Sequence, residues 1–186
     1  QESRELRRIA QSALDGLDGI VRLDFRQVGG SLGEEVRITR MVATENDLFL
    51  LDAGSGNVMH ALVTNQGLQM DTFFKCGSGI YNDVPVGPLI DISPLPSINT
   101  PNADLLGMDS NGNLLYCTVG AEPVALSLAP PSVGWVGIRN FSLDIDGRNL
   151  YLLDQNAIWV YAGVLGEFSD LPISFFSEQV PHDMNQ

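Results

Sequence analysis

The chain has 186 residues, of which 44% are hydrophobic, and a mean hydropathy of +0.07, so it can fill the core of a folded domain. Its 10 basic and 23 acidic residues give a net charge of -13. That charge repels phosphate groups, and no clustered basic face is present, which excludes nucleic acid and anionic membrane surfaces as expected partners. No apolar run approaches the roughly 18 residues of a membrane span, so we expect no direct membrane insertion.

Residues 2–17 predict one amphipathic helix, because apolar side chains recur at three- and four-residue steps between arginines. Two Asp-Gly pairs then end the pattern. We therefore expect an N-terminal helix over residues 1–17 and a β domain over residues 18–186. The helix is either the end of a longer stalk or a helix that packs on its own domain. The segment Ile20 to Val28 alternates apolar and polar residues, which predicts a strand with one exposed face.

Three units of similar length follow, each made of four apolar runs separated by polar or glycine-containing turns. They open at Ile38, Val86 and Trp135 and span about residues 38–85, 86–134 and 135–181. A four-stranded antiparallel unit that recurs about every 40 to 50 residues is typical of a propeller blade. A β-sandwich is the alternative, but equal unit lengths favour blades. The sequence predicts an all-β fold: a β-propeller fragment of about three four-stranded antiparallel blades, preceded by one amphipathic helix.

Three blades are too few for a closed ring, since propellers contain about four to eight blades. Two arrangements would supply the missing blades. The chain is either a fragment of a larger propeller, or two copies assemble as a homodimer that completes a six-bladed ring. Both remain open from the sequence.

Residues 48–63 (LFLLDAGSGNVMHALV) and 150–162 (LYLLDQNAIWVYA) share an apolar run closed by Asp, a short polar turn and a second apolar run. This pattern resembles the second and third strands of NHL-type and gluconolactonase-like six-bladed β-propellers. A helix leading into such blades is similar to the C-terminal propeller regions of certain large bacterial proteins, some of which carry a metal-dependent protein phosphatase domain upstream. The sequence leaves the compartment unknown, and the extracytoplasmic side of a membrane-anchored parent protein is the location that we consider. No phosphatase motif is present here, so that activity is not implied.

Asp52, Asp109 and Asp154 end the same apolar run in each unit. Gluconolactonase-like enzymes hold a channel metal with carboxylates, so the resemblance makes these three aspartates candidate metal ligands. An Asp that opens a turn also accepts hydrogen bonds from backbone N–H groups of that turn. A metal site needs its ligands once, whereas a turn needs its Asp in every copy. We therefore predict a structural role for the three aspartates and no metal site.

Two further motifs suggest chemistry. Residues 29–33 (GGSLG) match the G-x-S-x-G spelling of a nucleophile elbow around Ser31, but a strand pattern follows where the elbow needs a helix, so we predict a glycine loop. Residues 144–147 (DIDG) and 109–113 (DSNGN) resemble calcium loops. Their glycine stands at position 4, whereas an EF-hand loop has it at position 6, and Asn-Gly and Asp-Gly pairs are hairpin signals, so we predict turns.

The two cysteines and two histidines offer no clear metal site or catalytic site. Cys76 and Cys117 stand in apolar strand contexts, so we expect two buried thiols, with a disulfide between them as the alternative. His60 lies on an alternating strand, which predicts a surface or half-buried residue and not a metal ligand. His182 is the other histidine.

No combination of these residues forms a catalytic constellation or a cofactor motif, so we expect no catalytic residues and no cofactor. The favoured function is a non-catalytic binding or protein-interaction module that recognises a protein, peptide or glycan ligand on the loop face of the propeller. The alternative function is a channel-metal hydrolase of gluconolactonase type.

Overall fold

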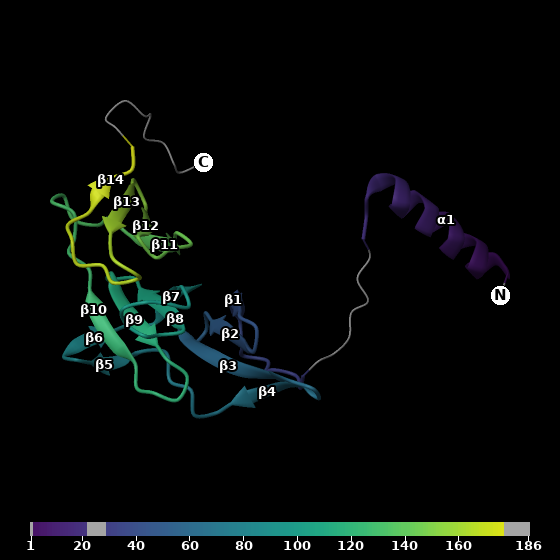
Figure 1. Ribbon diagram of the computed structural model, residues 1–186, viewed down its shortest axis with the longest axis horizontal. Helices are drawn as coiled ribbons and strands as arrows, with labels where there is room; N and C mark the ends of the chain where they lie inside the picture. Colours follow the sequence, from purple (N-terminus) through teal and green to yellow (C-terminus); the bar gives the residue numbers. More distant parts are fainter. Residues whose placement is uncertain (1, 22–28, 177–186) are drawn as a thin grey trace. The chain divides into compact units, whose positions relative to one another are not determined.

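The computed structural model describes residues 2–21 and 29–176, which fall into two compact units, residues 1–30 and 31–186. The first unit contains the predicted N-terminal helix, α1 (Glu2–Asp18) (Figure 1). Its apolar side chains, among them Leu6, Ile9, Leu14 and Leu17, are exposed. No helix among the described residues is long and apolar enough to cross a membrane. Ile20 and Val21 belong to no strand, and the rest of the predicted strand over residues 20–28 lies outside the described residues.

The second unit is built from three four-stranded antiparallel sheets (Figure 1). Sheet I contains β1 (Ile38–Ala43), β2 (Asp47–Asp52), β3 (Asn57–Thr64) and β4 (Gly67–Asp71). Sheet II contains β7 (Leu89–Pro94), β8 (Leu105–Asp109), β9 (Asn113–Cys117) and β10 (Val124–Ser127). Sheet III contains β11 (Ile138–Leu143), β12 (Asn149–Asp154), β13 (Ile158–Ala162) and β14 (Ile173–Ser174). In each sheet every strand pairs with the next along the chain, so the prediction of three blade-like meanders is confirmed.

A two-stranded hairpin between sheets I and II was not predicted. It consists of β5 (Gly79–Tyr81) and β6 (Val84–Val86). Asn82 and Asp83 connect the two strands and have positive φ angles of 50° and 64°, as both central residues of a type I′ turn require. The predicted second unit begins at Val86, which in fact belongs to this hairpin. The first strand of sheet II begins at Leu89, where the sequence predicts the first strand of this unit.

The first strand of sheet III begins at Ile138, later than the Val136 that the sequence predicts. The cause is a change of hydrogen-bond partner. The N–H groups of Val136 and Gly137 donate to the carboxylate of Asp154 and are therefore not used in the strand ladder. The corresponding N–H of Gly87, just before β7, donates to Asp109 in the same way.

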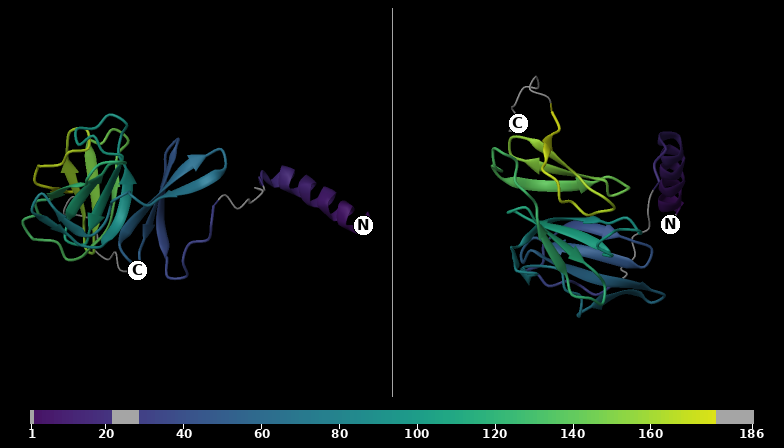
Figure 2. Two further views of the ribbon diagram at one scale, coloured as in Figure 1. Left: turned by 90° about the horizontal axis from the view of Figure 1, so that it is seen from below. Right: turned by 60° about the vertical axis from the view of Figure 1, so that its left-hand side comes forward.

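The three sheets pack face to face in chain order, and Figure 2 shows sheet II (teal) next to sheet I (blue) and sheet III (green to yellow). One apolar cluster fills the interface between sheets I and II, and a second fills the interface between sheets II and III. Every residue of β8 and β9 is buried, because sheet II is covered on both faces. The first strands β1, β7 and β11 are the strands through which neighbouring sheets approach each other.

Strand register is the same in the three sheets. Ile38 pairs with Asp52, Leu89 with Asp109, and Ile138 with Asp154, and in each case the register shifts directly after this pair. A bulge at the same position of each first strand is a repeated structural feature. This shared register defines which residues of the three sheets are equivalent.

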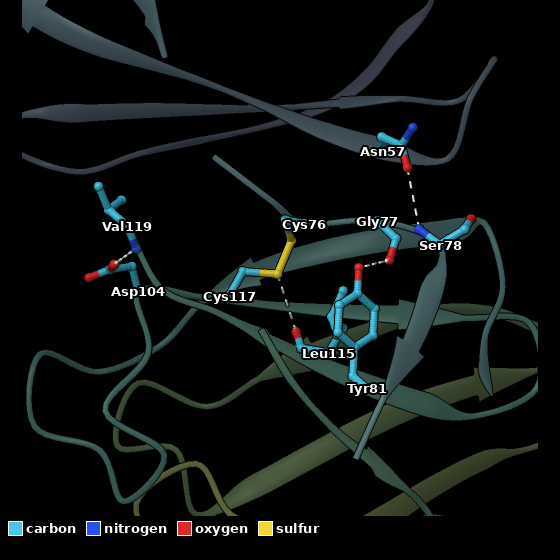
Figure 3. Close-up of a disulfide and its surroundings, with 9 residues drawn as sticks. All are labelled: Asn57, Cys76, Gly77, Ser78, Tyr81, Asp104, Leu115, Cys117 and Val119. Atoms are coloured by element: carbon cyan, nitrogen blue, oxygen red, sulfur yellow. Dashed lines mark hydrogen bonds between the residues drawn. A yellow bond between two sulfur atoms is a disulfide. The ribbon is translucent and has the colours of Figure 1, made fainter. Parts of the chain in front are cut away.

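Cys76 and Cys117 form a disulfide whose Cα atoms lie 5.6 Å apart (Figure 3). Cys76 follows sheet I, and its carbonyl oxygen accepts the N–H of Val58 in β3 at 2.7 Å. Cys117 is the last residue of β9, so the bond fixes the end of sheet I to sheet II. The expectation of two free thiols is wrong, although both sulfurs are buried as predicted. The two cysteines lie in different repeat units, and only the packing of the two sheets brings them together.

Candidate functional site

The three repeated aspartates, Asp52, Asp109 and Asp154, are buried and bind backbone N–H groups from two segments at once. One segment is the turn that each aspartate opens. Its donors are Gly54 and Ser55 for Asp52, Asn111 and Asn113 for Asp109, and Gln155 for Asp154. The other segment leads into the first strand of the same sheet. Its donors are Arg37, Gly87, and Val136 with Gly137. The predicted hydrogen bonds to the turn are confirmed, and each aspartate also holds the first strand to the second.

Hydrogen bonds favour the ionised carboxylates of Asp52 and Asp154. The N–H of Arg37, followed by the hydroxyl of Ser55, lowers the pKa of Asp52 to about 2. Burial is the largest single influence on Asp154 and raises its pKa, but hydrogen bonds, led by those from the N–H groups of Val136 and Gly137, together outweigh it and the pKa is lowered. Each oxygen of Asp52, Asp109 and Asp154 accepts at least one hydrogen bond. A cation at any of them would have to displace these donors.

The candidate metal ligands are not brought together. Within residues 2–21 and 29–176, no three His, Cys, Asp or Glu side chains converge on a point that could hold a metal ion. The two stretches that resemble calcium loops are hairpin turns, as predicted. Asp109 Oδ1 accepts the N–H of Asn111 at 2.8 Å, and Asp144 Oδ1 accepts the N–H of Arg148 at 2.6 Å.

The segment around Ser31 has no elbow. Residues 29–37 form neither helix nor strand, and β1 begins at Ile38, so no helix presents the serine. Ser31 is exposed in this loop. His182 lies outside the described residues.

His60 is fully buried, so the prediction of a surface or half-buried residue is wrong. Its Nε2 lies 2.8 Å from Asp47 Oδ1 and its Nδ1 lies 3.0 Å from Asp71 Oδ2. The ring also stacks on Phe49, with centroids 4.9 Å apart. Sheet II covers this face of sheet I, and a buried imidazole is tolerated there because both of its nitrogens are paired. Because each nitrogen contacts a carboxylate, neither is free to contact a substrate while both contacts hold.

An open groove of about 610 Å³ lies between the loops that connect the first and second strands of sheets II and III. Its lining consists of residues 93–98, 143–146, Arg148 and Leu165. Ile98, Ile145 and Leu165 are exposed at the groove, although they are large and apolar. The lining includes two carboxylates, Asp144 and Asp146, and one guanidinium, Arg148, so the groove combines apolar surface with an excess of negative charge. The Asp-Gly pattern at residues 144–147 predicts a turn, and no sequence signal indicates this groove, which forms between loops of two sheets.

Close contacts between loops give the groove a fixed shape. The N–H of Gly166 donates to the carbonyl of Gly147 at 2.7 Å, and the hydroxyl of Tyr116 donates to the carbonyl of Gly166 at 3.0 Å. Gly147 and Gly166 have φ angles of 63° and 86°, and a Cβ on Gly147 would lie only 2.9 Å from the nitrogen of Gly166. Both positions therefore require glycine. The loops that connect β7 to β8, β11 to β12 and β13 to β14 therefore form one preorganised surface.

The chemical groups at the groove are suited to binding. Its polar side chains are serines, the two carboxylates and Arg148, whereas His60 is buried in sheet I with both nitrogens paired. Exposed apolar side chains next to fixed polar groups are the usual composition of a ligand site. Comparison with known proteins adds no activity, because the chain matches no protein-family model, no curated protein and no solved structure.

Proposed function

We propose that this chain is a non-catalytic interaction module that binds a peptide segment of a partner protein in the groove between the loops of sheets II and III. One observation carries the proposal: exposed Ile98 and Ile145 stand beside the carboxylates of Asp144 and Asp146 in a groove whose loops are fixed by hydrogen bonds. Large apolar side chains exposed together are a feature of interaction surfaces.

The chemistry of the groove selects a peptide with apolar and basic side chains. An apolar side chain of the ligand would pack on Ile98 and Ile145. A lysine or arginine would meet Asp144 and Asp146, of which Asp146 is exposed. The net charge of -13 would attract such a ligand over longer distances and would repel acidic ones.

We also propose that the three sheets belong to a β-propeller of the NHL-type and gluconolactonase-like kind, within a larger bacterial protein. The equal register of the three sheets supports this assignment, as does the repeated run that ends in Asp52, Asp109 and Asp154. Propellers commonly bind ligands on the faces formed by their loops. The groove lies on such loops.

The disulfide supports an extracytoplasmic location. Disulfides persist in oxidising compartments and are rare in the reducing cytosol of most organisms. The Cys76–Cys117 bond is buried between sheets I and II and joins parts of the chain 41 residues apart. We therefore place the protein, as a proposal, on the oxidising side of a membrane.

No observation favours the alternative of a channel-metal hydrolase. That function needs carboxylates with oxygens free to bind a cation, whereas Asp52, Asp109 and Asp154 use theirs for backbone N–H groups. The interaction module is therefore the function that we put forward.

Selection of peptides from a random library on the immobilised chain, followed by calorimetry with the selected peptides, tests this function. We expect ligands that combine basic and apolar residues. Their affinity should fall by about tenfold or more for the double variant Ile98→Ser/Ile145→Ser, since both apolar contacts are lost. It should also fall as salt rises from about 50 mM to about 500 mM, because the carboxylates contribute through charge.

Ile80→Ser is the matched control, because Ile80 is also a large exposed apolar residue but lies on β5, away from the groove. This variant should bind the peptides as the unchanged protein does. Peptides that bind the double variant and the unchanged protein equally well would show that the groove is not the binding site. A selection that yields no peptide with basic character would contradict the proposed ligand class.

A further inference from the structure

The two end sheets each have one face buried against sheet II and one face that points away from it. Because the three sheets share one register, each residue on these outer faces has an equivalent in the other two sheets. The burial of the equivalent residues shows whether an outer face has the composition of an interface between two sheets. In sheets I and II, the forward face is the face that packs on the next sheet in the chain. In sheet III, the forward face is the one that carries the equivalent residues. The opposite face of each sheet is its rear face.

The forward face of sheet III has the composition of a sheet interface. Tyr151, Leu153, Ile158 and Val160 occupy this face, by strand pairing and alternation. In sheet I the equivalent positions are Phe49, Leu51, Val58 and His60, and in sheet II they are Leu106, Met108, Leu114 and Tyr116; all eight are buried. Leu153 is 38% exposed, whereas its equivalents Leu51 and Met108 are 1% and 0% exposed.

The rear face of sheet I is mostly apolar, with the polar pair Asp52 and Asn57 at the end of β2 and the start of β3. Its apolar residues, by the same pairing, are Met41, Ala43, Leu48, Leu50, Met59, Ala61, Val63, Leu68 and Met70. Met41 is 66% exposed, whereas its equivalents Ile92 in sheet II and Phe141 in sheet III are 3% and 4% exposed, since each packs against the preceding sheet. A largely apolar face on a four-stranded sheet is the surface that a further sheet would cover.

The forward face of sheet III and the rear face of sheet I are the two kinds of face that pack on each other inside the chain. Inside the chain, a forward face packs on a rear face twice, from sheet I to sheet II and from sheet II to sheet III. Among the sheets of residues 29–176, one forward face, on sheet III, and one rear face, on sheet I, remain. These are the two halves of a third interface of the same kind.

We propose that a second copy of this chain supplies the missing halves, so that sheet III of each copy packs on sheet I of the other in a twofold-symmetric dimer. The number of sheets fits this arrangement. Two copies give six sheets, within the roughly four to eight of closed propellers, whereas three copies would give nine. A head-to-tail contact made twice around a twofold axis closes a ring and covers the outer faces of sheets I and III in both copies.

The assembly is tested by analytical ultracentrifugation of the whole chain over a range of micromolar concentrations. We expect a species of twice 20.2 kDa that dissociates on dilution. Met41→Glu and Leu153→Arg, on the rear face of sheet I and the forward face of sheet III, should each raise the dissociation constant of the dimer by about 10- to 100-fold. The control variant Ile80→Glu places the same charge on the exposed hairpin and should leave the dimer unchanged.

Mixing the two variants identifies which faces meet. A dimer of one Met41→Glu chain and one Leu153→Arg chain retains one unaltered interface, in which sheet III of the first chain meets sheet I of the second. The mixture should therefore dimerise more tightly than either variant alone. A contact between two copies of sheet I would instead be sensitive to Met41→Glu only and would not recover on mixing.

Circular dichroism of each variant confirms that it is folded before the sedimentation result is used. A folded, unchanged chain that sediments as a 20.2 kDa monomer at every concentration would overturn the proposal. So would filaments or higher oligomers that do not close at two copies, because the sheets would then be set at an angle that the ring does not allow.

Discussion

The guanidinium of Arg40 in β1 lies against the carboxylate of Asp91 in β7, with Nε 2.6 Å from Oδ1 and Nη2 3.2 Å from Oδ2. The two residues occupy equivalent positions in sheets I and II, directly after the register shift of each first strand. Asp91 is buried and also accepts the N–H of Phe141 in β11 at 3.2 Å. One carboxylate therefore links the first strands of all three sheets. This contact raises the pKa of Arg40, through the hydrogen bond first and the charge second.

A double-mutant cycle should reveal this link. Asp91→Ala is expected to lower the free energy of unfolding by about 2 to 3 kcal/mol, because buried backbone donors lose their acceptor. Arg40→Ala should cost less in the Asp91→Ala background than in the unchanged protein. The coupling should be about 1 kcal/mol, smaller than for a fully buried pair because 43% of the Arg40 side chain is exposed. Urea denaturation of the four proteins measures it, and strictly additive effects would show that the two residues act independently.

Asp109 should be important for stability. Asp109→Ala removes the acceptor for the N–H groups of Gly87, Asn111 and Asn113, all near the first turn of sheet II. We expect a loss of at least about 2 kcal/mol, since a buried donor without an acceptor costs about 1 to 3 kcal/mol. The control Asp146→Ala, at an exposed carboxylate, should change stability by less than about 0.5 kcal/mol. Equal thermal stability of the two variants would contradict the structural role of Asp109.

Reduction of the disulfide should destabilise the second unit. The bond closes a loop with a sequence separation of 41 residues, for which loss of chain entropy in the unfolded state predicts a contribution of about 3 to 4 kcal/mol. Cys76→Ala/Cys117→Ala should therefore unfold at a lower urea concentration than the oxidised protein. Dithiothreitol should shift the midpoint of the oxidised protein and leave that of the double variant unchanged. A midpoint of the oxidised protein that does not respond to the reductant would contradict this prediction.

Acid should weaken the fold through Asp52. Its pKa in the folded state, about 2, lies below the ordinary value of 3.8, so the folded state favours the ionised carboxylate. The resulting stabilisation is complete above pH 3.8 and is lost as the pH falls from 3.8 through about 2. Asp52→Asn lacks this titration, so its urea midpoint should fall less between about pH 5 and about pH 2.5 than that of the unchanged protein. Parallel pH profiles of the two proteins would rule out this role of Asp52.

Several parts of this fold follow from the sequence because they depend on local patterns. The apolar runs that alternate with polar turns predict the strands, and Asn-Gly and Asp-Gly pairs predict the hairpins between them. The recurrence of Asp52, Asp109 and Asp154 at the end of one run predicts that each accepts hydrogen bonds from its own turn. These interactions connect residues a few positions apart, so one copy of the repeat contains all the information that they need.

Only the tertiary structure decides which distant residues meet. Whether Cys76 and Cys117 are thiols or a disulfide depends on how sheet I packs on sheet II, because strand patterns do not specify the distance between two sheets. The same packing buries His60 between Asp47 and Asp71, where alternation alone predicts a partly exposed residue. The groove at Ile98 and Ile145 likewise forms only where loops of two sheets come together. Local sequence determines the strands, whereas long-range packing determines the site, since its residues come from different sheets.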